Sequence, residues 1–156
     1  MVAGVFNINE FDFALSMGLA LLAGFLIGAE RESKGKAAGI GTHCFVIGGS
    51  MIFTYISALV DPNSTSRIAA QIVTGIGFLG AGIILKGELF DNKDSDNPSN
   101  KKVVNLTTAA SIWFSGAIGM AIGFNFYFIA IVSIAFALIV PRIPKVGKRR
   151  QEDTDE

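Results

Sequence analysis

Five long apolar runs without a single charged residue limit what this chain can fold into. They cover about residues 13–29, 44–60, 68–85, 103–124 and 126–140. Each approaches the roughly 17–25 residues that a helix needs to cross about 30 Å of hydrocarbon. Because backbone amides find no water there, a lipid-exposed crossing segment must be a helix or part of a closed barrel. The strict alternation typical of barrel strands is missing. The sequence therefore predicts an all-α membrane bundle of five transmembrane helices.

The basic residues are distributed very unevenly between these runs. All but one of the 13 lysines and arginines follow the first, third or fifth run, and the exception is Arg67. With five spans, these three segments lie on one side of the membrane. Lysine and arginine are retained on the cytoplasmic side, so we expect the N-terminus outside and the C-terminus in the cytoplasm. Residues 1–144 then form the transmembrane domain, and residues 145–156 form a charged cytoplasmic tail whose basic part rests on anionic lipid.

Small residues recur at every fourth position in several runs, which is typical of membrane helices that pack closely. The third run is the densest in glycine, between residues 75 and 82. Two interpretations of that density stay open: close helix contact, or a locally broken helix that exposes backbone to a ligand or an ion. The glycines predicted to serve helix packing are Gly24, Gly28, Gly75, Gly77, Gly80, Gly82, Gly119 and Gly123.

The third run also contains Gly75-Ile-Gly77-Phe-Leu-Gly80, which matches the glycine fingerprint of dinucleotide-binding proteins. That fingerprint requires a preceding strand and a soluble βαβ unit. Here the glycines lie inside a predicted membrane helix. We therefore expect neither nucleotide binding nor a nucleic-acid partner.

Polar residues near the cytoplasmic ends of the spans are the candidates for a functional site, because ionisable groups in membranes are usually functional. No carboxylate lies in the middle of a span. Glu30 and Glu32 are the candidate metal ligands, since magnesium prefers oxygen ligands; alternatively they pair with Arg31, Lys34 or lipid headgroups. His43 is either a ligand or pH sensor, or an interfacial hydrogen-bonding residue. The predicted polar or ion site comprises Glu30, Glu32, His43, Asn105, Thr107 and Thr108.

The remaining polar residues point to other roles. The alternative role of Asn105 and the threonines after it is helix capping and bonding between helices. Trp113, about two turns into the fourth run, is expected to be a packing residue. The single histidine lacks an obvious nucleophile, so we expect no enzyme, no catalytic residue and no cofactor. A polar group on the outer side comprises Arg67, Gln71 and Thr74.

Four stretches of this sequence resemble the MgtC/SapB family of bacterial inner-membrane proteins. They are residues 28–32 (GAERE), 39–43 (GIGTH), 67–82 (RIAAQIVTGIGFLGAG) and 106–113 (LTTAASIW). The chain departs from the family at Gly41, where members usually carry arginine, and at Asn105, where glycine is common. Many members continue into a soluble C-terminal domain, and we expect functions of that domain to be missing here.

The resemblance implies a role in adaptation to magnesium limitation and, in pathogens, in survival inside host cells. It also implies restraint of ATP synthase and regulation by small membrane peptides. Two hypotheses for this chain follow. In the first, a non-enzymatic protein acts through helix contacts, as a homodimer or with membrane-protein or small-peptide partners. In the second, a small ion or solute transporter, with magnesium as the candidate ion, uses the polar site at the cytoplasmic side.

Overall fold

The computed structural model describes residues 10–91 and 104–143, and they form a bundle of five α-helices. This confirms the all-helical prediction, whereas the predicted tail, residues 145–156, lies outside the described residues. The helices are α1 (Glu10–Ser33), α2 (Ile40–Val60), α3 (Thr65–Asp91), α4 (Leu106–Gly123) and α5 (Tyr127–Ile139), and a short 3₁₀ helix, η2 (Val140–Arg142), follows.

Four of the helices are long and apolar enough to cross a membrane, namely α1 to α4. The fifth, α5, has 13 residues and is therefore only about 20 Å long at 1.5 Å per residue. Its length is restricted at both ends. Asn125 adopts a left-handed conformation, with φ at 61°, in the turn after α4, and Pro141 falls in the tighter η2. The full crossing of the fifth span stays a prediction.

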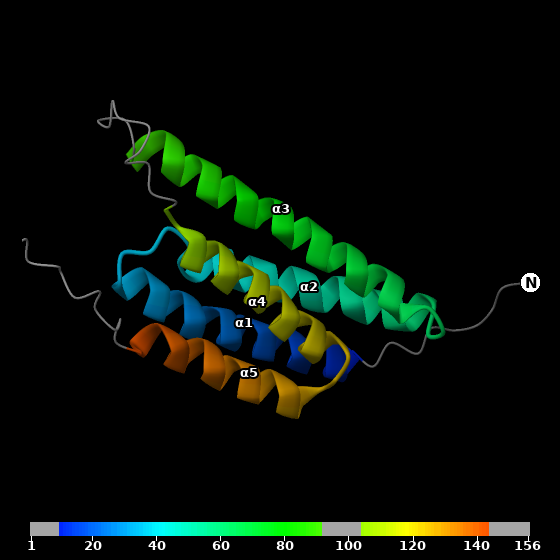
Figure 1. The fold of residues 1–156 in the computed structure, drawn as a ribbon. Helices are drawn as coiled ribbons and strands as arrows, with labels where there is room; N and C mark the ends of the chain where they lie inside the picture. The colour runs from blue at the N-terminus through cyan, green and yellow to red at the C-terminus, as the bar shows by residue number, and fades with distance from the viewer. Residues whose placement is uncertain (1–9, 92–103, 144–156) are drawn as a thin grey trace, which may run out of the picture.

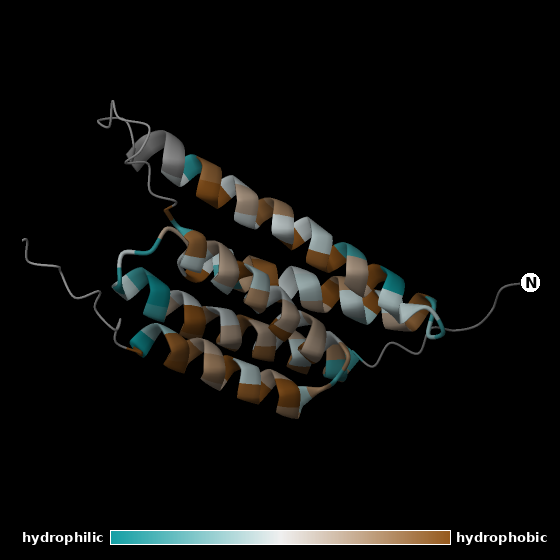
Figure 2. Ribbon diagram, in the orientation of Figure 1, coloured by the Kyte–Doolittle hydropathy of each residue, from teal (hydrophilic) through white to brown (hydrophobic). Residues whose placement is uncertain are grey.

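The helices are arranged with α2 and α4 in the middle, α1 and α5 on one side and α3 on the other (Figure 1). Hydrophilic residues gather towards the ends of the helices (Figure 2). Isoleucines from three helices dominate the core because they fill the space between closely packed backbones. The largest fully buried apolar side chains are Ile27, Ile47, Met51, Ile112, Ile118 and Ile122.

Successive helices run in opposite directions. At one end of the bundle, α1, α3 and α5 end and α2 and α4 begin (Figure 1). We call this the basic end because it carries Arg31, Lys34 and Arg142. The arrangement agrees with the clustering of basic residues in the sequence, and the placement of this end in the cytoplasm stays a prediction.

Glycines bring α1, α2 and α4 into close backbone contact. A Cβ atom at Gly24 would lie 2.5 Å from Cys44 Cα, and one at Gly123 would lie 2.7 Å from the Met51 carbonyl oxygen. These separations are far below ordinary contact distances of about 3.5–4.0 Å. Gly28 against Ile40 and Gly119 against Ile47 are equally close.

The third helix uses its glycines differently. It is continuous from Thr65 to Asp91, so the broken-helix interpretation is wrong. Gly80 makes ordinary contact with Ala109 of α4. A Cβ atom at Gly75, Gly77 or Gly82, in contrast, would have no neighbour within 4 Å among the described residues. Those three glycines therefore make no close helix contact within the described residues, although their spacing predicts helix packing.

Candidate functional site

A buried arginine lies where α1 meets α4. The small residues of α1 at positions 20, 24 and 28 are buried, and Arg31 continues the same face one turn later. Its side chain is only 2% exposed, and Nη2 donates a 3.0 Å hydrogen bond to Thr108 Oγ1 of α4. Bonding between helices is the usual way in which a membrane protein accommodates such a charged group. The bond therefore ties the basic end of α1 to the first turn of α4.

A second buried bond lies deeper in the bundle, between α2 and α4. His43 is fully buried, and its Nδ1 lies 2.8 Å from Ser115 Oγ. Thr108 and Ser115 are seven residues apart and therefore lie on the same face of α4. That face receives the arginine from α1 and the histidine from α2. We call the four residues of the two bonds the buried polar network.

The buried polar network keeps unused hydrogen-bonding capacity. Arg31 Nε and His43 Nε2 are buried and have no hydrogen-bond partner among the described residues. An unpaired polar group away from water costs about 1–3 kcal/mol. These two atoms are therefore the places in the network where a water molecule or a polar ligand would be stabilised.

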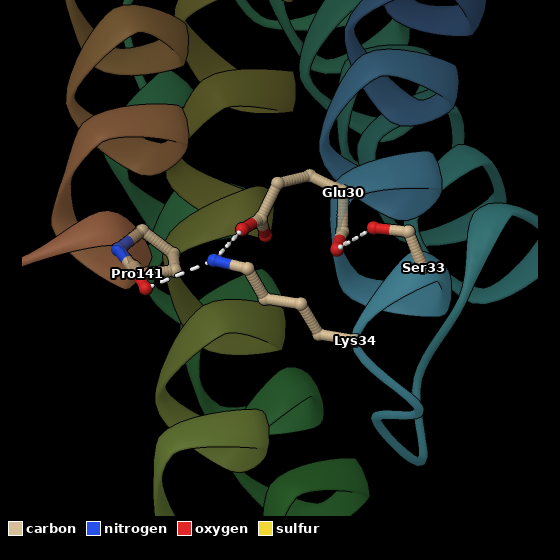
Figure 3. Close-up of polar contacts among 4 residues, drawn as sticks. All are labelled: Glu30, Ser33, Lys34 and Pro141. Atoms are coloured by element: carbon tan, nitrogen blue, oxygen red, sulfur yellow. Dashed lines mark hydrogen bonds and ion pairs between the residues drawn. The ribbon is translucent and has the colours of Figure 1, made fainter.

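The two candidate metal ligands at the end of α1 have separate partners. Glu30 forms an ion pair with Lys34, whose Nζ also donates a 2.9 Å hydrogen bond to the carbonyl oxygen of Pro141 in η2 (Figure 3). Glu32 Oε2 accepts a 3.1 Å hydrogen bond from the amide of Ile40, the first residue of α2. Within residues 10–91 and 104–143, no group of three or more His, Cys, Asp or Glu side chains could hold a metal ion.

The structure does not bring all six predicted site residues together. His43 and Thr108 belong to the buried polar network, whereas Thr107 is exposed. Asn105 occupies the N-cap position of α4 in a left-handed conformation, and its side chain makes no capping bond. Its amide lies near Gly87 at the end of α3 instead. The capping role considered for Asn105 is therefore wrong, while the inter-helix bonding considered for this segment occurs at Thr108.

The polar residues predicted for the outer side lie on one exposed helix. Arg67, Gln71 and Thr74 all belong to α3 and are exposed. Thr74 Oγ1 donates a hydrogen bond to the Ala70 carbonyl of its own helix. Trp113, expected to be a packing residue, is 51% exposed, so its packing role stays a prediction.

Reasoning from the sequence missed Arg31 and Ser115 as site residues. From the sequence, Arg31 counts as one of the basic residues that set orientation and as a possible partner of Glu30 and Glu32. The signal that could have found it is the small-residue ladder of α1, which reaches Arg31 when extended by three residues from Gly28. Ser115 belongs to the ladder of α4, and its histidine partner could not be identified without knowing how α2 packs.

The fold and the network define a multi-pass α-helical membrane protein with a polar centre between its first, second and fourth helices. Comparison with known proteins gives the family. The model of the MgtC family matches residues 17–149, and this chain belongs to that family. No solved structure matches it.

Three relatives illustrate the similarity. The "Putative magnesium transporter YhiD" of Escherichia coli K12 is 39% identical over 141 residues, which cover 83% of this chain and 59% of the relative. Protein MgtC of Salmonella typhimurium LT2 is 41% identical over 113 residues, covering 72% and 44%. Protein SapB of Bacillus subtilis 168 is 35% identical over 161 residues, covering 92% and 63%. The chain therefore spans less than two thirds of each of these relatives.

Proposed function

We propose that this protein is a non-enzymatic protein of the bacterial inner membrane that serves adaptation to magnesium limitation. We further propose that it acts through helix contacts with a second copy, as a homodimer, or with other membrane proteins or small membrane peptides. The family supports the link to magnesium. The observation that carries the mode of action is the exposed surface of α3, which is the least buried of the four long helices.

One face of α3 is open along much of its length. Exposed residues recur on it at intervals of three and four, as expected for one side of a helix. Gln71 among them has no hydrogen-bond partner among the described residues, although a lipid environment offers its amide none. We call this set the open face of α3, and it comprises Arg67, Gln71, Thr74, Phe78 and Gly82.

Two hollows of about 460 and 450 Å³ lie between α2 and α3, alongside the open face. Phe53, Ile68 and Gln71 line both hollows, so the two adjoin. Small residues let helix backbones approach closely, and polar side chains such as glutamine bond across helices. The open face and the hollows together therefore suit a further transmembrane helix.

A matched pair of substitutions tests this proposal. Gly82 of α3 and Gly18 of α1 both have open space around them and both are exposed. We expect Gly82→Leu to weaken assembly, measured by cross-linking in membranes, and to abolish growth support at limiting magnesium in a host that lacks its own MgtC-family protein. Gly18→Leu should do neither. Normal assembly and growth with Gly82→Leu would reject the contact surface, and no growth benefit from the unaltered protein would reject the magnesium link.

A second candidate function is transport of magnesium or another small ion. It is favoured by the name of the Escherichia coli relative and by the acidic residues at the basic end. Purified protein in liposomes should then carry magnesium, and Glu30→Gln or Glu32→Gln should abolish the flux. Absence of flux with any common cation would count against this alternative.

A further inference from the structure

A groove of about 290 Å³ opens at the basic end between α1, α4 and α5. Its walls are almost entirely apolar and include aromatic side chains from two helices. Ile27 comes from α1, Trp113 and Phe114 from α4, and Phe136 from α5. In a membrane, an apolar groove of this kind accommodates an acyl chain.

One basic residue lines the groove, and two others are next to a residue that lines it. Arg31 and Pro141 line it, and Lys34 reaches the Pro141 carbonyl at 2.9 Å (Figure 3). Arg142 follows directly and is exposed. The Glu30 carboxylate pairs with Lys34 and offsets only part of this charge. The mouth therefore keeps an excess of positive charge.

The beginning of α4 adds to the attraction for an anion. Thr107, in the first turn of α4, lines the groove, and the residue before that turn contributes no side-chain capping bond. The unpaired amides of a first turn and the helix dipole favour a negative group. Independently of the helix end, the buried Arg31 has Nε without a partner.

We propose that this groove binds an anionic phospholipid. The phosphate lies between Lys34, Arg142 and the first turn of α4, above the buried Arg31. One acyl chain lies along Trp113 and the neighbouring aromatic side chains. A zwitterionic lipid would bring its own cation into a region that already has excess positive charge, and a soluble anion would leave the apolar groove unfilled. This proposal does not rest on the proposed function.

Trp113 is the single tryptophan of the chain, and it lies half exposed in this groove. Its fluorescence therefore reports which lipid occupies the site. The full chain is reconstituted in mixtures of phosphatidylcholine and phosphatidylglycerol, with bromine on the acyl chains of one lipid at a time. We expect brominated phosphatidylglycerol to quench Trp113 with a preference of about fivefold or more over phosphatidylcholine.

Two charge variants separate a specific site from general surface charge. Arg142→Gln should lower the preference by about fivefold, because one cation near a membrane surface is worth about that factor. Lys36→Gln changes an exposed residue in the loop after α1 and should leave the preference unchanged. Lys36 is not next to any residue that lines the groove, whereas Arg142 directly follows Pro141.

Three results would overturn the proposal. Equal quenching by the two brominated lipids would show no selectivity. Equal losses in Arg142→Gln and Lys36→Gln would show general attraction to the surface only. Protection of Trp113 from both lipids would show that another protein helix covers the groove.

Discussion

The contact between α2 and α4 at Gly119 gives a sharp test of the packing. In Gly119→Ala the new Cβ atom would lie 2.7 Å from Ser50 Cβ and closer still to the Ile47 carbonyl oxygen. Because one of these neighbours is backbone, side-chain rotation cannot relieve the clash, and the two helices must separate by about 1 Å to restore ordinary contact. Overpacking of this kind costs about 1–3 kcal/mol.

The matched control is Gly77→Ala in α3, where the added methyl group meets no described atom within 4 Å. Alanine is favoured over glycine in an aqueous helix by about 1 kcal/mol, and this gain applies to both variants. We therefore expect Gly119→Ala to lose about 2 kcal/mol of unfolding free energy. This is the upper overpacking cost of about 3 kcal/mol minus the gain of about 1 kcal/mol from helix propensity. Gly77→Ala, which has only the gain, should be stabilised by up to about 1 kcal/mol.

The assay is reversible unfolding of the purified protein as sodium dodecyl sulfate is titrated into a mild detergent. A loss of about 2 kcal/mol changes the folded-to-unfolded ratio by about thirtyfold, which such a titration resolves. A Gly119→Ala variant as stable as the unaltered protein would refute the contact. Equal losses in the two variants would show that the cost does not come from the close contact at Gly119.

Three further predictions concern polar contacts. Thr108→Val removes the acceptor of the buried arginine and should cost about 1.5–3 kcal/mol in the same titration, because bonds to charged groups are the stronger ones; an unchanged midpoint would show that the bond is not needed. Ser115→Ala should cost less, about 0.6–1.7 kcal/mol, as for other hydrogen bonds between membrane helices, and a larger loss than that of Thr108→Val would reverse our ranking. Glu32→Ala removes the bond to the Ile40 amide and should speed hydrogen exchange at the start of α2; unaltered exchange there would argue against a capping role.

The helices themselves were predictable from the apolar runs, because lipid permits few other structures for such segments. The differences lie at the boundaries. The second run was predicted to begin at residue 44, whereas α2 begins at Ile40, where Glu32 supplies a partner for the first amide. The third was predicted to end at residue 85, whereas α3 continues to Asp91. Lys86 therefore marks the end of the apolar run but not the end of α3.

The site was less predictable than the fold. Every charged residue near a membrane boundary looks alike in sequence, but Arg31 is almost completely buried. Its burial depends on the rotation of α1 against α4, which distant contacts determine. The packing of the glycines is equally hard to predict from the sequence, because Gly77 and Gly119 have similar apolar neighbours along the chain. Only the positions of the other helices show that Gly119 is enclosed and Gly77 is open.

The two bonds of the buried polar network also order the biosynthesis of the chain. They join residues that are 77 and 72 positions apart. When α1 and α2 leave the ribosome and enter the bilayer, their arginine and histidine have no partner, because α4 has not yet been made. The first hairpin must keep these groups near the headgroups until α4 arrives. We therefore expect these two bonds to form only after the fourth helix has been made.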